Sequence, residues 1–442
     1  MEGGKRKEKK EREEFFFSID HLLAWTSSTS RPHQPSPLFS SHLFSPSSSA
    51  ASGKLSVTRV WSRSEVSSNA LASALSAASP DLLATFGGEE GGGALEEVLT
   101  SGEVDAVLLI LPVQAMPSVA RRALAAGKAV LQEKPVAGTV TEALKTLEAA
   151  REAAAAAAKK NKNSNLFPVF ALAENYRSEP GVLAAADAAR KLSDPTSKKG
   201  NNVTTVSLVG NMPMNRSNRY HGSQWRRDAQ GCPGCFLMDS CVHFVAALRS
   251  VSAAAGLGEV ARVGARAGSR CDGEENDLPA PDTLVSWLEF ENAEGTANGA
   301  VSVTFAGAAP RFALTLDTRR GAVELSRGAY GGGNGNGGRG AGYNVAVTAV
   351  GGGGAEAETA SEFHPFGGLE GELESFLRLA RGRGTKADAA ALSPASAARD
   401  LGLIEAMLRS SEGSGAPVEV ERIGGGGGEE LDPLETGFGV AL

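Results

Sequence analysis

Strand-like and helix-like segments alternate over residues 54–173, and this alternation limits the fold more than any other feature. Val104–Leu111 is a continuous apolar run typical of a buried parallel strand, and Pro117–Ala126 follows it as a helix that Gly127 closes. Such alternation predicts an α/β fold with a doubly wound parallel sheet. The other predicted elements are strands at Leu55–Trp61, Ala129–Leu131 and Phe167–Ala173 and helices at Ala70–Ala78, Leu95–Ser101 and Thr141–Lys159.

Beyond residue 180 strands follow one another without helices between them. We expect residues 174–423 to form an α+β domain on an open, mostly antiparallel sheet. Gly328–Gly342 predicts a long glycine-rich hairpin loop, and Gly367–Leu379 and Ala395–Ser410 predict amphipathic helices. The predicted strands are Val203–Gly210, Leu284–Phe290, Ala300–Ala306, Phe312–Leu316, Ala322–Ser326 and Tyr343–Val350.

The two ends of the chain have neither helical nor strand periodicity. Residues 1–53 are rich in Phe, Ser and Pro, and residues 424–442 are rich in Gly and Glu, so we expect both to be disordered. The basic cluster Lys5–Arg12 alternates with Glu, which is typical of a solvated tail. Thr26–Gly53 leaves an organellar transit peptide open, because it is Ser-rich and free of acidic residues, although the Glu-rich start does not suit one.

Composition argues against several classes of protein. The net charge of −7 argues against a nucleic-acid-binding surface, which needs a clustered basic face. No apolar run approaches the roughly 20 residues of a membrane helix. Four cysteines in 442 residues indicate a reducing compartment and no disulfide framework. We therefore expect a cytoplasmic protein that binds neither nucleic acid nor a membrane.

Two motifs carry charged side chains suited to catalysis. Glu133-Lys134-Pro135 comes just past a buried strand, where an α/β cofactor site needs a cation. Asp239 and His243 stand four residues apart, a spacing that places both on one helix face. Together they suit an acid/base set beside a nicotinamide, because a hydroxyl proton must leave when hydride leaves. Taken singly, each motif also fits chance or a surface helix pair.

Further motifs occur in the same order: Asn175-Tyr176-Arg177, Trp225-Arg226, and the run from Gly234 to His243. With Glu133-Lys134-Pro135 they resemble the Gfo/Idh/MocA family of NAD(P)-dependent oxidoreductases, from about Lys54 to Val420. The resemblance implies a Rossmann domain followed by a domain on an open, largely antiparallel sheet, through which homo-oligomers can form. It also implies that Lys134 lies near the nicotinamide and that Asp239 and His243 supply acid/base chemistry. Our hypothesis is His243 as general base, Asp239 as the carboxylate that orients it, and Lys134 as electrostatic catalyst.

The resemblance also implies where the cofactor and a small-molecule substrate bind. Ser62, Arg63 and Ser64 stand where an NAD enzyme usually carries an acidic residue on the ribose hydroxyls, so NADP is favoured over NAD. The other residues expected at the cofactor are Pro112, Gln114, Glu133, Lys134, Trp225 and Arg226. The residues expected at the substrate are Lys134, Asn175, Arg177 and His243.

One part of the family pattern is missing, so the Rossmann-like sheet is expected to be incomplete. The family begins with a strand and a Gly-x-Gly-x-x-Gly turn that admits the pyrophosphate to a helix N-terminus, and residues 1–53 contain neither. Leu55–Trp61 corresponds to the second strand of the family. A faulty gene model at the N-terminus is favoured over a degenerate relative. The run from Gly333 to Gly338 matches the motif by glycine content alone, because no strand-to-helix transition surrounds it.

Two alternatives concern the cysteines and the missing turn. Cys232, Cys235, Cys241 and His243 are potential zinc ligands, although a zinc knuckle spaces its pairs further apart and metal binding would remove the base. As a Cys-x-x-Cys pair, Cys232 and Cys235 lack the strand-helix context of a redox site. Without its glycine turn the chain suits a non-catalytic binding or regulatory relative. We expect no metal, and hydride transfer at a hydroxyl or carbonyl carbon of a sugar, polyol or cyclic alcohol, a substrate class that the resemblance implies.

Overall fold

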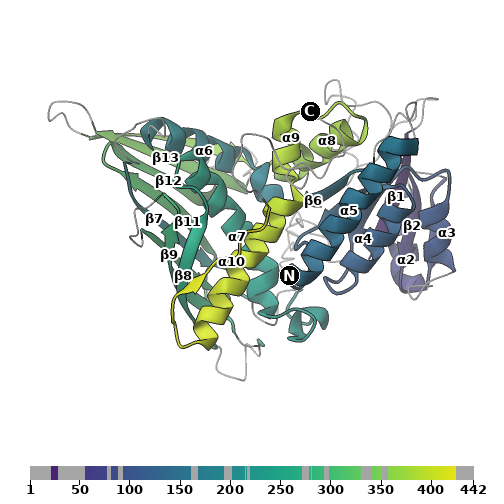
Figure 1. Ribbon diagram of the computed structural model, residues 1–442, viewed down its shortest axis with the longest axis horizontal. Helices are drawn as coiled ribbons and strands as arrows, with labels where there is room; N and C mark the ends of the chain where they lie inside the picture. The colour runs from purple at the N-terminus through teal and green to yellow at the C-terminus, as the bar shows by residue number, and fades with distance from the viewer. Residues whose placement is uncertain are drawn as a thin grey trace, which may run out of the picture.

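The computed structural model of the chain contains two β-sheets with helices packed on and between them (Figure 1). It describes residues 21–27, 55–76, 81–87, 93–160, 168–193, 202–214, 216, 220–270, 278–279, 281–292, 298–329, 341–350 and 357–424. A sheet with parallel strands comes first along the chain, and a mostly antiparallel sheet follows it. The predicted fold class is therefore confirmed.

The first sheet has six strands in the order β3-β2-β1-β4-β5-β6, which is the strand order of a Rossmann sheet. Parallel pairs join β2 to β3, β4 to β5, and β5 to β6. The strands are β1 (His21–Ser27), β2 (Leu55–Ser62), β3 (Leu83–Phe86), β4 (Ala106–Ile110), β5 (Ala129–Glu133) and β6 (Phe170–Ala173).

Strand β1 occupies the central position that the sequence analysis left empty. It pairs with both β2 and β4, and both pairings are antiparallel. The prediction that residues 1–53 contain no strand is therefore wrong for His21–Ser27. A strand in this place satisfies the backbone hydrogen-bonding groups of two neighbours that would otherwise be exposed edges. The rest of residues 1–53 lies outside the described residues, as does most of Gly328–Gly342.

The direction of β1 decides which edge of the sheet its ends reach. His21 pairs with Ser62 and Ile110, the last residues of β2 and β4, whereas Ser27 pairs with Leu55, the first residue of β2. The chain thus enters β1 at the carboxyl edge of the parallel strands and leaves it at the opposite edge. A glycine turn after this strand would lie at the wrong edge for a dinucleotide, which binds at carboxyl ends.

Helices cover both faces of the first sheet. Helices α3, α4 and α5 share one hydrophobic core with Trp61, Val107 and Leu109. Helix α2 and the late helices α8 and α9 share another core with Val60 of β2 and Leu131 of β5. Both side chains lie on the other face of the sheet. The bounds are α2 (Glu65–Leu75), α3 (Ala94–Thr100), α4 (Met116–Ala125), α5 (Val140–Lys160), α8 (Gly368–Ala380) and α9 (Lys386–Ala391).

The second sheet has nine strands in the order β14-β13-β12-β11-β7-β10-β9-β8-β15, and only β7 and β10 pair in parallel among them. Strands β8, β14 and β15 were not predicted, because their residues lack a clear alternation of bulky apolar side chains. The strands are β7 (Val203–Asn211), β8 (Val260–Gly268), β9 (Thr283–Phe290), β10 (Gly299–Thr304), β11 (Arg311–Thr318), β12 (Gly321–Ala329), β13 (Ala341–Val350), β14 (Ala357–Pro365) and β15 (Val418–Glu419).

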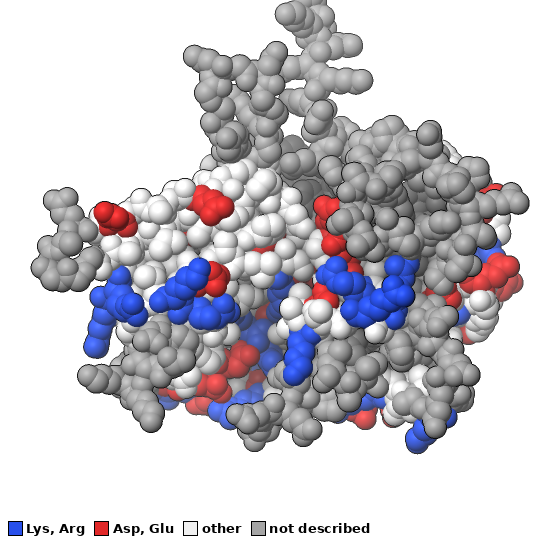
Figure 2. All heavy atoms as spheres, turned by 90° about the horizontal axis from the view of Figure 1, so that it is seen from above, with Lys and Arg blue, Asp and Glu red and all other residues white. Residues whose placement is uncertain are grey.

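One face of this sheet packs on helices, and the described helices leave the other face open. The helices α6 (Pro180–Ser193) and α7 (Cys235–Ala254) lie on the inner side, towards the first sheet (Figure 1). Leu284 and Leu288 of β9 face them and are buried, whereas the alternate residue Val285 is 53% exposed. On the side seen in Figure 2, basic and acidic side chains of the described residues are interspersed around a broad uncharged area.

Helix α7 is the core helix of the second domain. Among the described helices, it alone is long and apolar enough to cross a membrane by length and composition. The prediction that no apolar segment approaches the length of a membrane helix is therefore wrong for α7. However, 89% of its apolar window is buried inside the protein, where it contacts α6, β7 and the late helix α10 (Pro394–Glu412). Burial on all sides accounts for its apolar sequence.

Candidate active site

The three residues predicted to be catalytic, Lys134, Asp239 and His243, lie where β5 and β6 end and α7 begins. Lys134 directly follows β5 at the carboxyl edge of the first sheet. A turn starts α7: the Cys235 N–H donates to the Cys232 carbonyl oxygen at 2.9 Å, and Gly234 has a φ of 82°, which favours glycine. One turn later, Asp239 Oδ1 lies 3.1 Å from Lys134 Nζ, which also donates to the Asp239 carbonyl oxygen at 3.0 Å. The two domains thus share one ion pair.

Asp239 is held by a second cation. Arg226 Nε, in the 3-10 helix η2 (Trp225–Arg227), donates to Asp239 Oδ2 at 2.8 Å, and its guanidinium lies 4.0 Å from the centre of the Trp225 ring. The side chains are 15% exposed for Lys134, 10% for Arg226 and 6% for Asp239. Burial alone would raise the pKa of Asp239, but the two cations outweigh burial and lower that pKa. Two cations around one carboxylate leave the group with an excess positive charge.

The partner of His243 is Glu174, not Asp239. His243 Nδ1 lies 2.7 Å from Glu174 Oε1, and the Glu174 side chain is 2% exposed. The expected role of Asp239 as the residue that orients His243 is therefore corrected, because Lys134 and Arg226 occupy both of its carboxylate oxygens. Sequence analysis missed Glu174, although its signal was the same as that of Lys134: a charged residue near the carboxyl end of a buried parallel strand.

The His243 ring is fixed in orientation. Tyr176 stacks on it with ring centroids 5.0 Å apart and an angle of 22° between the planes. Burial alone would raise the pKa of Glu174, but His243, Arg177 and Lys134 outweigh burial and lower it, so Glu174 is a carboxylate. A carboxylate accepts a hydrogen from Nδ1, which leaves Nε2 as the nitrogen that can exchange a proton with a substrate.

Glu133, the last residue of β5, lies among these charges. Burial raises its pKa, Lys134 and His243 offset part of that effect, and the Glu174 and Asp239 carboxylates add to it. Glu133 therefore holds its proton more strongly than a carboxyl group in water.

Two other residues predicted at the cofactor, Pro112 and Gln114, lie in the loop after β4. Gln114 donates from Nε2 to the Trp225 carbonyl oxygen at 3.1 Å. This bond ties the carboxyl edge of the first sheet to η2, which carries Trp225 and Arg226. Pro112, two residues before Gln114, is buried.

The residues predicted to select NADP follow β2 at the same edge. Ser62 ends the strand and is 1% exposed, and Arg63 is exposed. Ser64 caps α2, because its Oγ accepts a backbone N–H of the first turn at 3.2 Å. This cap accounts for the start of α2 at Glu65 and not at Ala70, where the sequence analysis placed it.

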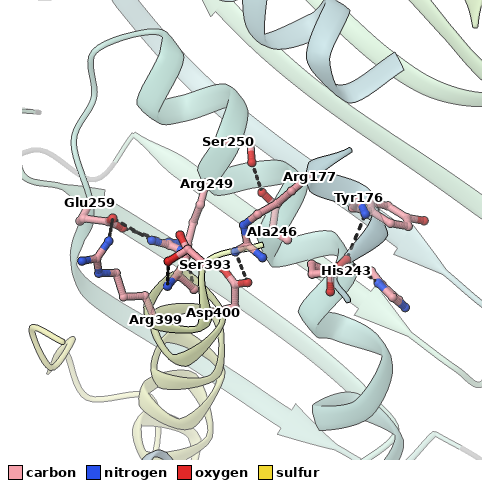
Figure 3. A network of polar contacts seen from close by, with 12 residues as sticks. Tyr176, Arg177, His243, Ala246, Arg249, Ser250, Glu259, Ser393, Arg399 and Asp400 are labelled. Carbon is pink, nitrogen blue, oxygen red and sulfur yellow. Dashed lines mark hydrogen bonds and ion pairs between the residues drawn. The ribbon is translucent and has the colours of Figure 1, made fainter. Parts of the chain in front are cut away.

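The two remaining predicted substrate residues have different surroundings. Asn175, in the 3-10 helix η1 (Asn175–Arg177), donates from Nδ2 to Glu179 Oε1 at 3.3 Å. Arg177 turns into a buried ionic network, where its guanidinium contacts Asp400 of α10 (Figure 3). Arg177 therefore bonds Asp400 and not Lys134 or His243, although its charge also acts on Glu174.

That network joins α7, α10 and η1. Arg249 Nη1 lies 2.5 Å from Asp400 Oδ1, and the same guanidinium holds Glu259 with two bonds of 2.9 and 2.7 Å. Arg399 Nη1 lies 3.8 Å from Glu259 Oε1 (Figure 3). The side chains of Arg177, Arg249 and Asp400 are each less than 10% exposed.

The cysteines and His243 form no ligand cluster. Cys232, Cys235 and Cys241 are buried free thiols. In the part of the chain that the structure describes, no three His, Cys, Asp or Glu side chains could together hold a metal ion. Burial raises the pKa of each thiol, that of Cys241 to about 12, so the thiols remain protonated.

The arrangement suits the nicotinamide ring of a dinucleotide better than its pyrophosphate. Residues after β2, β4, β5 and β6 gather at one carboxyl edge, where α/β sheets bind such cofactors. The Lys134 ammonium group and the His243 imidazole lie in this part of the molecule. No strand among the described residues is followed by a Gly-x-Gly-x-x-Gly turn for the pyrophosphate.

Comparison with known proteins supports the family assignment. Residues 40–160 match the family model described as the Gfo/Idh/MocA oxidoreductase family, NAD-binding Rossmann fold. Dehydrogenase FPY6 of Fusarium mangiferae is 27% identical over 165 residues, which cover 37% of this chain and 42% of the relative. The matched region thus spans less than half of the length of this curated relative.

Solved oxidoreductases share the fold over most of the chain. One from Thermotoga maritima is 23% identical, with a TM-score of 0.57 over 82% of this chain and 90% of that chain. Levoglucosan dehydrogenase, solved with NADH and L-sorbose, is 14% identical, with a TM-score of 0.58 over 83% of this chain and 90% of that chain. At these identities the likeness shows the fold alone. As the sequence motifs predicted, residues 40–160 are similar to the NAD-binding Rossmann domain of the Gfo/Idh/MocA oxidoreductase family.

Proposed function

We propose that this protein is an NAD(P)-dependent dehydrogenase that transfers hydride between a nicotinamide and a hydroxyl or carbonyl carbon of a sugar, polyol or cyclic alcohol. The observation that carries the proposal is the placement of Lys134 and the Glu174–His243 pair at one carboxyl edge. The family match supports the cofactor class. The sugar bound to levoglucosan dehydrogenase supports the substrate class.

His243 is the proposed general base. When an alcohol is oxidised, its hydroxyl proton must leave as hydride passes to the nicotinamide, which is the chemistry that the cofactor supplies when bound. Nε2 takes that proton, because Nδ1 is engaged by Glu174. The Glu174 carboxylate then stabilises the imidazolium, and Tyr176 keeps the ring in its plane.

Lys134 is proposed to stabilise the charge that develops on the substrate oxygen. Two of its three ammonium hydrogens bond Asp239, so one hydrogen is left for the substrate. Arg226 occupies the other oxygen of Asp239, so the carboxylate does not fully neutralise Lys134. The excess positive charge of this buried group favours an alkoxide at the same place.

Cofactor preference and assembly follow from two other places in the fold. Arg63 is exposed just after β2, where a cation suits the 2′-phosphate of NADP, so we propose that NADP is preferred. The open face of the second sheet supports a homo-oligomer. A cytoplasmic compartment stays a prediction.

One observation favours a second candidate, a non-catalytic binding or regulatory protein. Strand β1 is antiparallel, and the described residues place no glycine turn at the carboxyl edge. The two candidates differ in whether the chain binds a dinucleotide and turns over a substrate.

The substitution Lys134→Met tests the catalytic proposal. With NADP or NAD and a panel of sugars, polyols and cyclic alcohols, we expect kcat/KM to fall about a hundredfold or more, because a preorganised cation is lost. The unfolding transition should remain, since Arg226 still pairs with Asp239. Lys145→Met is the matched control, because Lys145 is 61% exposed on α5. Equal activity of the Lys134 variant and the wild type would exclude the proposed role.

A further inference from the structure

Helix α8 packs on η1 and β6, the elements next to Glu174, and carries a buried carboxyl group. The N–H of Gly367, just before the helix, donates to Glu179 Oε2 at 3.1 Å. A Cβ added at Gly368 would lie 2.5 Å from the Asn175 carbonyl oxygen, so the first turn of α8 packs directly on η1. Glu372 follows on the next turn and is only 4% exposed. Figure 1 shows α8 beside β6, the strand that leads into Glu174.

Two buried carboxyl oxygens in this region have no hydrogen-bond partner among the described residues: Glu174 Oε2 and Glu372 Oε2. Glu174 uses its other oxygen to hold His243. A buried carboxylate oxygen without a donor is costly, and two such oxygens in one region are more so. A proton on one of the carboxyl groups lowers this cost, because a neutral acid is itself a donor.

The charges around the two groups favour a proton on Glu372 over one on Glu174. His243, Arg177 and Lys134 act on Glu174 and keep it ionised. Burial and the carboxyl groups of Glu133 on β5, Glu174 after β6 and Glu179 before α6 raise the pKa of Glu372 well above its ordinary value. On α8 itself, the cation Arg378 is held by Asp388 at 2.6 Å.

We infer that Glu372 is a positioning residue of the proposed dehydrogenase: a neutral buried acid that donates its hydrogen to the carboxyl group behind His243. The catalytic role of Glu372 rests on the proposed function, whereas its position beside η1 does not. A donor on Glu174 draws charge away from the oxygen that holds His243, so the ring releases its proton more readily. The proton of Glu372 stays in place, and Glu372 does not touch the substrate.

Two substitutions in the full-length chain test this inference. Glu372→Gln keeps a neutral N–H donor, whereas Glu372→Met keeps the approximate size and removes the donor. The readout is the NMR titration of the His243 ring, with labelled histidines and with His243→Gln to assign its signal among the six. We expect Glu372→Gln to titrate as the wild type does. In Glu372→Met the midpoint should rise by roughly half a pH unit or more, because Glu174 then holds the imidazolium more tightly.

Glu370→Gln is the matched control, because Glu370 is an exposed carboxyl group on the same helix. A lower His243 midpoint in Glu372→Gln would show that a negative charge had been removed, and the inference would be wrong. An unchanged midpoint in folded Glu372→Met would show that Glu372 does not act through Glu174. If Glu372→Met fails to fold, infrared spectroscopy decides: a protonated-carboxyl band must be lost in Glu372→Gln. None of these readouts needs activity, so an inactive wild type would count against the proposed function alone.

Discussion

Two largely buried ionic clusters of the described residues adjoin η1, through Tyr176 and Arg177, and they differ in what they place at the carboxyl edge of the first sheet. In the network of Arg177, Asp400, Arg249 and Glu259, cations and anions alternate and bind one another. At the candidate site, Lys134 keeps one hydrogen and His243 keeps Nε2. Burial and ion pairing are common to both clusters, and Arg177 Nη1 in the packing network also lacks a partner among the described residues. The feature that marks the site is therefore the placement of a cation and a histidine nitrogen together at the carboxyl edge of the first sheet.

The largest effect is expected in the packing network. Asp400→Ala leaves Arg177 and Arg249 buried without their shared carboxylate, which should cost about 3–5 kcal/mol of unfolding free energy in urea. Asp187→Ala removes an exposed carboxylate that pairs with Lys191 on α6, so it should leave the urea midpoint unchanged. Equal urea midpoints for the two variants would show that the packing network does not stabilise the fold.

A matched pair of substitutions sharpens the comparison further. Glu174→Gln should lower kcat/KM about a hundredfold, because the imidazolium of His243 loses its counter-charge. Glu259→Gln makes the same chemical change in the packing network, and it should lower the unfolding midpoint while the folded protein keeps its activity. If both variants lost activity in proportion to stability, the distinction between the clusters would fail.

A third effect, small per pH unit, concerns how stability depends on pH. The folded-state pKa of Glu372 is raised, so its contribution to stability is full below the unfolded value of 4.5 and is lost as pH rises through the folded pKa. The folded-state pKa of Glu174 is lowered, so the contribution of Glu174 to stability is present above the unfolded pKa of 4.5. It is lost as the pH falls through the folded pKa. In urea unfolding, wild type relative to Glu372→Gln should lose about 1.4 kcal/mol per pH unit above 4.5 until Glu372 ionises. A flat difference would show that Glu372 is ionised in the folded protein.

Local patterns were sufficient for most of the fold. Val104–Leu111 is apolar throughout because helices cover both faces of β4, and Leu284–Phe290 alternates because one face of β9 is open. Strand β1 could not be predicted, because His21–Ser27 stands between stretches without periodicity and its place depends on the vacancy between β2 and β4. Only pairing with distant strands supplies that information.

The site was predictable in position and less so in its contacts. Glu133 and Lys134 were identified because they follow a buried strand. The spacing of Asp239 and His243 predicted a shared helix face, but it could not show that Lys134, 105 residues away in sequence, and Arg226 occupy Asp239. Arg177 was expected at the substrate because of its motif, yet Asp400, 223 residues later, binds it. Competition between distant partners decides these contacts.

The central claim is that this chain, with its reversed first strand, forms a working dinucleotide site. The most direct test is calorimetric titration of the purified, folded 442-residue chain with NADPH and with NADH. The account predicts saturable one-to-one binding with a Kd on the order of micromolar and a preference for NADPH. No binding of either cofactor by folded protein would contradict it and favour the non-catalytic relative.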